Sequence, residues 1–402
     1  MMQQLVVVGG GFAGLWAALG AVREAELAGA GATVQVTLLS PDPWLVMRPR
    51  LYERDPASLR QDLRPVLDAA GIRFLPGKAQ DVAGRELRYL DADGAARRLA
   101  FDRLVIATGS RMRPAPVPGL AEHGFDVDSL DGALRLDGHL AALSGQPDDA
   151  ARAGFVVLGG GFTGIEMALE LRDRVAAHHG AAAGEAATIH LVERAAEIGP
   201  DLGPGPRPVI LQALQDAGVA LHAGRQVAQV DATGAVLDDG TQLPARTVIG
   251  ATGMVAAEAW PGLAAPRDEA GRIHVDAALR VPGAEGVFAT GDAARAAVDE
   301  AGNLALMSCQ HALRMGRFAG YNAARDLLGL GLQPYRQPDY VTCLDLGRAG
   351  AVFTRGWDRA IAMTGAEAKA LKRRINGEII YPPPPERATI LEMAAIDYVW
   401  RR

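Results

Sequence analysis

The chain has 402 residues, enough for two or three domains with a well-buried core. Hydrophobic residues make up 49% and charged residues 22%, which excludes a disordered protein, and the formal charge of −6 argues against nucleic acid as its main partner. The two cysteines, Cys309 and Cys343, exclude a disulfide framework and a four-cysteine zinc site, and we expect no bound metal.

The chain starts directly with a β-like run, Leu5 to Val8, and not with a basic stretch followed by an apolar signal core. No stretch of about 18 apolar residues occurs, so we expect no transmembrane helix. The expected compartment is therefore the cytoplasm.

A glycine-rich loop follows the first predicted strand. Residues 5–14 read LVVVGGGFAG and place Gly9, Gly11 and Gly14 in a GxGxxG pattern. The first glycine permits a tight turn, the second lets the backbone approach a pyrophosphate, and the third allows close packing of helix on strand. The next helix then presents unpaired N–H groups to the phosphates. This pattern predicts a dinucleotide-binding loop.

The same unit occurs a second time. Residues 155–164 read FVVLGGGFTG, with Gly159, Gly161 and Gly164 in the same pattern. Two further predicted strands, 101–110 and 245–254, both end in Ala-Thr-Gly, and the strand at 287–294 ends at Gly291-Asp292. One GxGxxG alone is weak evidence, but this repetition predicts two Rossmann-like dinucleotide-binding domains.

The chain connections predict an α/β protein in which one such domain is inserted into the other. The Pro-rich segment 113–120 has the composition of a hinge, and 276–281 is expected to return to the first domain. We therefore predict a discontinuous first domain at 1–117 and 276–330, a second domain at 118–275, and a small C-terminal α+β region at 331–402.

Together these motifs resemble the two-dinucleotide-binding-domain flavoproteins, with their glutathione-reductase-like FAD/NAD(P)-binding fold, over roughly residues 1–330. Three segments look like the type II NADH dehydrogenase family: WLVMRPRLYE (44–53), GGGFTGIEMALEL (159–171) and SCQHALRMGRFAGYNA (308–323). The resemblance implies an FAD-dependent NAD(P)H dehydrogenase. It would pass a hydride from NADH to FAD and then electrons to a quinone-like or other small acceptor.

The resemblance places FAD on the first domain. Its pyrophosphate would lie over the first glycine loop, and Asp292 would hold its ribityl hydroxyls. The carboxylate that usually ends the second strand is replaced by Ser40, with Asp42 close behind. The residues expected to contact FAD are Gly9, Gly11, Phe12, Ala13, Gly14, Ser40, Arg48, Ala107, Thr108, Gly109, Gly291, Asp292, Ser308 and Gln310.

The second domain would bind the nicotinamide nucleotide. Glu193 ends the strand that follows the second loop, where a carboxylate binds both ribose hydroxyls and repels a 2′-phosphate. We therefore expect NADH, while Arg194 directly after it keeps NADPH open. The residues expected to contact the nucleotide are Gly159, Gly161, Phe162, Thr163, Gly164, Glu193 and Gly253.

In this arrangement the cofactors carry the chemistry and the protein positions them. By resemblance, Glu166 points at the nicotinamide–flavin contact and Gln310 lies at the quinone edge; the alternatives are a capping glutamate and a packing glutamine. A helix beginning near Ser308 would aim its N-terminus at the flavin. Cys309, a third candidate catalytic residue, stands where the family has alanine, and Met315 where it often has glutamine, so the quinone pocket departs from the family pattern.

The family's C-terminal Trp- and Leu-rich membrane helices are not recognisable in residues 331–402. This region carries 11 Lys/Arg against 8 Asp/Glu. Its last stretch, 388–402, is expected to form a helix with a mixed apolar surface. That helix would pack on the body or on a second subunit of a homodimer. Alternatively, with Trp400 at its end, it would make weak contact with the inner face of the membrane.

Other functions are separated by their cysteines and partners. A glutathione-reductase-like enzyme is excluded because no cysteine precedes Cys309, and no monooxygenase linker motif occurs. A sulfide:quinone-type enzyme would use Cys309 and Cys343 together. A reductase for a redox protein, like ferredoxin reductases, would use the basic C-terminal region for docking. A non-catalytic NADH-responsive protein is the third alternative.

Overall fold

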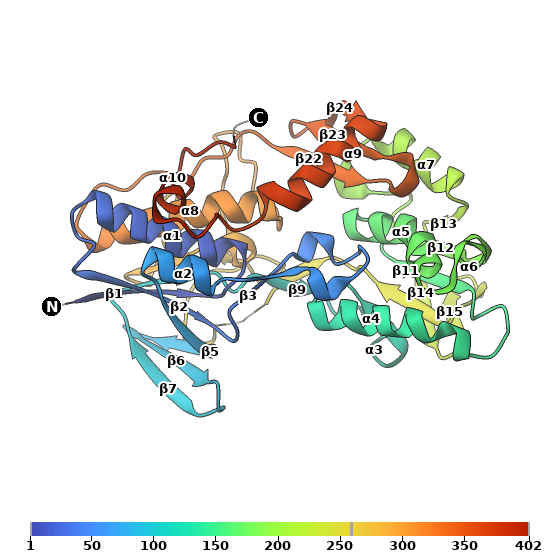
Figure 1. Ribbon diagram of the computed structural model, residues 1–402, viewed down its shortest axis with the longest axis horizontal. Coiled ribbons are helices and arrows are strands. Elements are labelled where there is room, and N and C mark those ends of the chain that lie inside the picture. The colour runs from blue at the N-terminus through green and yellow to red at the C-terminus, as the bar shows by residue number, and fades with distance from the viewer. Residues whose placement is uncertain (1, 258–259, 401–402) are drawn as a thin grey trace.

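Two sheets built mainly of parallel strands form the body of the molecule (Figure 1). The computed structural model describes residues 2–257 and 260–400. The first sheet has the order β20 (Val287–Ala289), β8 (Arg103–Ile106), β1 (Gln3–Val8), β2 (Val34–Ser40), β5 (Arg73–Ala83), β6 (Glu86–Asp91) and β7 (Ala96–Ala100). The second has the order β10 (Gly124–Asp126), β17 (Thr247–Gly250), β11 (Gly154–Leu158), β12 (Thr188–Glu193) and β13 (Val219–Ala223). The predicted α/β class is confirmed.

Each sheet starts from the same strand–loop–helix unit. Residues 5–8 of β1 and the whole of β11 are apolar and buried on both faces, as parallel strands covered by helices require. They lead into α1 (Phe12–Leu27) and α5 (Phe162–His179). The N-cap residues are the extended glycines Gly11 and Gly161, without a side-chain cap. The first N–H groups of both helices therefore stay available to a ligand.

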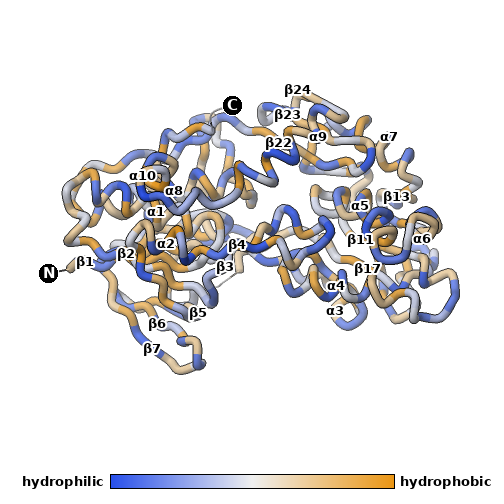
Figure 2. Tube along the Cα trace, in the orientation of Figure 1, coloured by the Kyte–Doolittle hydropathy of each residue, from blue (hydrophilic) through white to orange (hydrophobic). Residues whose placement is uncertain are grey.

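The remaining elements cover these sheets. Hydrophobic residues gather around α1, α2 and β2 in Figure 2. The short strands are β3 (Trp44–Val46), β4 (Arg60–Asp62), β14 (Val227–Asp231), β15 (Gly234–Leu237), β16 (Gln242–Pro244), β19 (Ile273–His274) and β21 (Ala294–Arg295). The further helices are α2 (Arg64–Ala70), α3 (Leu120–His123), α4 (Leu130–Ala142), α6 (Ala181–Ala186) and α7 (Arg207–Asp216). Along the described chain, no helix combines the length and apolar character needed to cross a bilayer.

A two-stranded ribbon joins the two halves. Strand β9 (Ser110–Met112) pairs antiparallel with β18 (Met254–Ala256). After β18 the chain already contacts the first domain, because the backbone N–H of Gly262 donates to Asp81 at 2.6 Å. We therefore propose that the second domain ends near residue 253, about twenty residues earlier than the boundary at 275 inferred from the sequence.

Helix α8 (Cys309–Leu327) lies directly against α1. A Cβ atom added to Gly316 would stand 2.4 Å from the carbonyl oxygen of Ala13, and one added to Gly320 would stand 1.9 Å from that of Ala17. Only glycine permits such backbone contact. The crossing fixes the start of α8 beside the first glycine loop.

The C-terminal region is a small sheet followed by helices. Strands β22 (Val341–Asp345), β23 (Ala351–Arg355) and β24 (Ala360–Thr364) are antiparallel and precede α9 (Gly365–Arg374), a π-helical turn (Ile375–Ile379) and α10 (Arg387–Met393). The region spans both domains, with β22 near α5 and α10 beside α1 (Figure 1).

The expected terminal helix is shorter than the sequence suggested, since α10 ends at Met393. Its buried side chains Ile390 and Met393 pack on the body. The chain then turns, so that the ring of Tyr398 lies 5.3 Å from the Arg317 guanidinium. Packing on the body, the first of the two alternatives, accounts for the described part of this segment; residues 401–402 lie outside the described residues.

Candidate active site

One cavity of about 1950 Å³ connects the two glycine loops. Gly11 and Phe12 line it from the first loop, and Gly161 and Phe162 from the second. The C-terminal region contributes walls from β22, β23 and α9. The expected contact residues that line this cavity are Gly11, Phe12, Ala13, Ser40, Arg48, Ala107, Gly109, Gly159, Gly161, Phe162, Thr163, Glu193, Gly253, Asp292, Ser308 and Gln310.

The other expected contact residues do not line the cavity but lie behind its wall: Gly9, Gly14, Thr108, Gly164 and Gly291. A Cβ atom on Gly14 would stand 1.8 Å from the carbonyl oxygen of Gly9, and one on Gly164 would stand 1.7 Å from that of Gly159. These third glycines therefore let each helix pack on its loop. Thr108 and Gly291 also lie outside the lining: Thr108 accepts a hydrogen bond from Trp260, and Gly291 donates to Met315.

The first and second glycines complete a cradle in each loop. Gly9 and Gly159 have φ of +108° and +103°, where an added Cβ would stand 2.3 Å and 2.2 Å from the neighbouring strand's carbonyl. At Gly11 and Gly161, by contrast, nothing lies within 4 Å of an added Cβ. Each loop thus has an open face beside helix N–H groups, which fits the pyrophosphate of a dinucleotide.

A polar network lies where the ribityl chain of FAD is expected. Ser110 donates to Asp292 at 2.6 Å, and the Arg48 guanidinium bonds to Ser110 and to Asp128, the latter at 2.5 Å. Burial raises the pKa of Asp292, while the Ser110 hydroxyl works against this rise. Asp292 lines the cavity with acceptor oxygens, which fit the donor hydroxyls of the FAD ribityl chain.

Ser40 and Asp42 differ in what they can reach. Ser40 ends β2 beside the first loop, since a Cβ added to Gly10 would stand 2.8 Å from its Oγ. Asp42 accepts a hydrogen bond from the backbone N–H of Trp44 at 3.0 Å. Both residues line the cavity. The short hydroxyl of Ser40 thus occupies the strand-end position that carries a carboxylate in the second domain.

Glu193 is held rigidly at the end of β12. One carboxylate oxygen accepts from the backbone N–H of Gly160 and the other from that of Ala195, both at 2.7 Å. The side chain is buried yet lines the cavity. A fixed carboxylate beside the second loop attracts ribose hydroxyls and repels a phosphate. Arg194, which follows, also lines the cavity.

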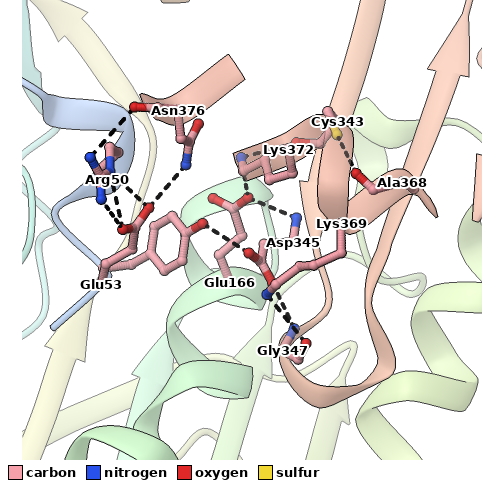
Figure 3. Close-up of polar contacts among 11 residues, drawn as sticks. Arg50, Glu53, Glu166, Cys343, Asp345, Gly347, Ala368, Lys369, Lys372 and Asn376 are labelled. Atoms are coloured by element: carbon pink, nitrogen blue, oxygen red, sulfur yellow. Dashed lines mark hydrogen bonds and ion pairs between the residues drawn. The ribbon is translucent and has the colours of Figure 1, made fainter. Parts of the chain in front are cut away.

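Glu166 lies in a buried ion pair that the sequence did not reveal (Figure 3). Lys372 of α9 places its Nζ 2.8 Å from Glu166 Oε1, and the backbone N–H of Asp345 donates to the same oxygen at 2.9 Å. Asp345 in turn pairs with Lys369 at 2.5 Å and accepts from the hydroxyl of Tyr52 at 3.3 Å. The three regions of the chain meet at this network.

The surroundings of the Glu166–Lys372 pair raise the pKa of both groups. Burial raises the pKa of Glu166, and the Lys372 ammonium offsets only part of that rise. Burial alone would lower the pKa of Lys372, but the neighbouring carboxylate outweighs it, so the net pKa is raised. Both residues line the cavity. The only signal in the sequence was the cluster of basic residues at 369–374, too general to identify Lys372.

Gln310 ties α8 to the C-terminal sheet. Its amide group donates to the carbonyl of Val341 at 3.1 Å and accepts from the N–H of the same residue at 3.3 Å. Cys309 and Cys343 are free thiols lining the cavity. Burial raises the pKa of each thiol to about 11. Both are therefore protonated near neutral pH, which disfavours thiolate chemistry.

The sequence pattern of the pyridine nucleotide-disulphide oxidoreductases matches residues 3–316, a span that contains both glycine loops. The chain belongs to this family. Its membership confirms the predicted FAD/NAD(P)-binding fold, and the relatives described next bear out the predicted FAD-dependent NAD(P)H dehydrogenase with FAD and NADH as its cofactors.

Relatives of this oxidoreductase are similar over nearly the whole chain. An NADH dehydrogenase-like protein of Mycobacterium tuberculosis is 44% identical over 98% of both chains. The demethylphylloquinone reductase of Synechocystis is 28% identical over 92% of this chain and 91% of its own.

Solved structures share the fold at low identity. NDH2 from Plasmodium falciparum in complex with NADH has a TM-score of 0.76, with 14% identity and 98% of both chains covered. The sulfide:quinone oxidoreductase of Aquifex aeolicus has a TM-score of 0.75, with 17% identity, covering 96% of this chain and 92% of its own.

Proposed function

We propose that this oxidoreductase takes a hydride from NADH onto FAD and delivers the electrons to a small quinone-type acceptor. The observation that carries the proposal is the continuity of the cavity. Both glycine loops, Glu166, Gln310 and a set of apolar side chains line this one cavity. The apolar side chains, called the apolar lining below, come from the π-helical turn, from β3 and from the segment after α10: Trp44, Val46, Ile375, Ile379, Ile380 and Trp400.

NADH is the expected donor because of Glu193. Its two oxygens are held in place by backbone N–H groups, so the carboxylate cannot easily turn away from a 2′-phosphate. Repulsion at that position disfavours NADPH. The name of the 44% identical relative, an NADH dehydrogenase-like protein, supports the same donor.

Bound FAD would supply the redox chemistry, accepting a hydride and returning electrons. The chain's own residues bind the cofactors and orient them. Asp292 accepts hydrogen bonds, and the first turn of α8, capped by Ser308, aims its positive end at the cavity. Lys372 lines the same cavity and holds a proton at Nζ, 2.8 Å from Glu166 Oε1.

We propose the acceptor site from the apolar lining of the cavity. Flat ring systems bury well among Trp, Ile and Val side chains. The names of three relatives support a quinone: one is a demethylphylloquinone reductase, and two are type II NADH:quinone oxidoreductases at 22% and 24% identity. The raised pKa of Cys309 and Cys343 gives a sulfide-oxidising route no support.

Stopped-flow separation of the two half-reactions tests this proposal. NADH should bleach the flavin, and a soluble short-chain quinone should restore its absorbance. Ile379→Asp, which puts a charge into the apolar lining, should slow recovery by quinone about tenfold or more and leave bleaching by NADH nearly unchanged. If Ile379→Asp slows only bleaching, the acceptor does not bind against this lining.

Contacts beyond the cavity stay predictions. Several basic side chains of the C-terminal region are used within the chain, among them Lys369, Lys372 and Arg348. Fewer are therefore left for a docked redox protein or for a membrane surface at the inner face. Co-sedimentation of the purified protein with anionic vesicles tests the membrane contact. Sedimentation velocity of the protein alone gives the oligomeric state.

A further inference from the structure

A buried arginine of the C-terminal region lines the cavity and has no ionic partner among the described residues. Arg359 stands in the turn between β23 and β24 and is 7% exposed. Its guanidinium lies over the ring of Tyr340 at 4.2 Å, and that ring stacks on Trp357 with centroids 4.6 Å apart. All three residues line the main cavity.

The hydrogen bonding of Arg359 is incomplete. Nη2 donates to the carbonyl oxygen of Asp201 at 3.2 Å, and Nη1 has no partner within the described chain. No carboxylate in the described ranges 2–257 and 260–400 forms an ion pair with this guanidinium. A buried charge is normally paired, because desolvation without a counter-charge is costly. The stacked rings hold the group but do not neutralise it.

Arg359 contacts the segment that supports the second glycine loop. The backbone N–H of Gly199 donates to the carbonyl of Gly160 at 3.0 Å, and Asp201, two residues on, accepts from Arg359. A Cβ added to Gly203 would stand 3.1 Å from Arg359 Cγ. The positive charge therefore reaches the cavity wall beside the loop whose open face is at Gly161.

We propose that Arg359 is a nucleotide-binding residue that supplies positive charge to the pyrophosphate of NADH from the C-terminal region. This inference rests on the proposed use of NADH. Unlike the glycine loop, the Arg359 guanidinium would bind the phosphates from outside the dinucleotide-binding fold. Guanidinium groups suit phosphate oxygens in shape and charge. The acceptor-side region would thus also complete the donor site.

Isothermal titration of the oxidised, FAD-loaded protein with ADP-ribose tests the proposal. ADP-ribose carries the pyrophosphate and no nicotinamide, so binding is measured without turnover. Arg359→Gln should raise the dissociation constant for ADP-ribose about 10- to 100-fold, as expected for loss of a charged hydrogen bond. The variant should also flatten the dependence of binding on salt, because one charged contact is gone.

Two variants separate charge from structure. Arg359→Lys keeps the charge and should bind ADP-ribose within about fivefold of the wild type. Both variants keep a non-glycine residue at the φ of 60°, so backbone strain is equal. Arg373→Gln, on the exposed face of α9, removes a charge elsewhere in the region and should bind like the wild type.

Three results would overturn the proposal. In the first, folded Arg359→Gln binds ADP-ribose within twofold of the wild type. In the second, Arg359→Lys loses as much affinity as Arg359→Gln and neither loss depends on salt, which indicates a purely structural role. In the third, the wild type itself does not bind ADP-ribose, which also removes NADH as donor. ADP-ribose binding without quinone reduction would instead contradict only the proposed acceptor.

Discussion

The two glycine loops share the same close backbone contacts but have different surroundings. In both, the third glycine packs on the first, and the second faces open space. Two residues after the third glycine, α1 carries Trp16 and α5 carries Glu166. Each meets a cation from another element: the Arg317 guanidinium lies 4.1 Å from the Trp16 ring, and Lys372 pairs with Glu166. The backbone provides a general dinucleotide cradle, and side chains brought from elsewhere make the two cradles different.

The strand ends show the same division. Ser40 ends β2 with a hydroxyl, whereas Glu193 ends β12 with a carboxylate held by two backbone N–H groups. The second loop is also covered by the segment around Asp201, which Arg359 contacts. We therefore propose that selectivity for one dinucleotide over another resides in single side chains, which can be tested position by position.

The largest expected effect comes from breaking each cradle separately. Gly14→Ala should abolish FAD retention, because the new Cβ would overlap the Gly9 carbonyl, at a cost of more than about 4 kcal/mol. Gly164→Ala should abolish ADP-ribose binding and leave FAD bound. Absorbance of heat-released flavin and titration with ADP-ribose measure the two losses. If both variants lose both ligands, the cradles are not independent.

A second test compares the two cations. Lys372→Met should lower the free energy of unfolding by about 3–5 kcal/mol, because it leaves the buried Glu166 carboxylate unpaired. Arg317→Met, which removes a cation from an aromatic ring, should lower it by only about 1–2 kcal/mol. Urea denaturation of both variants gives the comparison.

The pH dependence of the Lys372→Met deficit has a defined sign. The folded-state pKa of Glu166 is raised, so the penalty of the buried carboxylate is present at high pH and disappears as pH falls below the ordinary glutamate range. The deficit should therefore be smaller at pH 5 than at pH 8. A Glu166→Gln/Lys372→Met double variant should recover most of the stability. Equal deficits at both pH values would show that removing Lys372 causes no extra proton uptake at Glu166 in the folded protein between pH 5 and pH 8.

A smaller effect is expected from making the strand ends alike. Glu193→Gln should weaken the binding of NADH and relieve the repulsion of the 2′-phosphate of NADPH. The ratio of kcat/KM for NADH to that for NADPH should therefore fall by about tenfold. Steady-state kinetics with both nucleotides measure it. The matched control Glu197→Gln, at an exposed residue near the same loop, should leave the ratio unchanged. A wild type that already prefers NADPH tenfold would contradict the assignment of Glu193.

The smallest effect concerns the thiol at the start of α8, which has no counterpart beside the second loop. Burial raises the pKa of Cys309 to about 11, from an ordinary value near 9. Alkylation of the folded protein by iodoacetamide should therefore be slow at pH 8 and rise towards pH 11. By linkage, the thiol's contribution to stability is present below about pH 9 and lost as pH rises to about 11. Mass spectrometry of Cys309, with Cys343→Ala as background, checks the rates.

The sequence predicted those parts of the site that depend on local pattern. Glycine spacing located both loops, and strand ends located Glu193 and Asp292, because turn geometry and strand termination are written in a few neighbouring residues. Lys372 and Arg359 could not be found in this way. They reach the cavity only through the packing of residues 331–402 across both domains. The β9–β18 ribbon, from which we propose the end of the second domain, is likewise a pairing of distant segments.

The contact of α8 with α1 has a consequence for how the protein loses its flavin. Because Gly316 and Gly320 put the two helix backbones against each other, the start of α8 cannot shift without loosening α1 behind the first loop. Release of the yellow chromophore on heating should therefore report the separation of this helix pair. The temperature at which flavin fluorescence rises therefore reports the stability of this core. Gly320→Ala should lower that temperature, although Gly320 does not line the cavity.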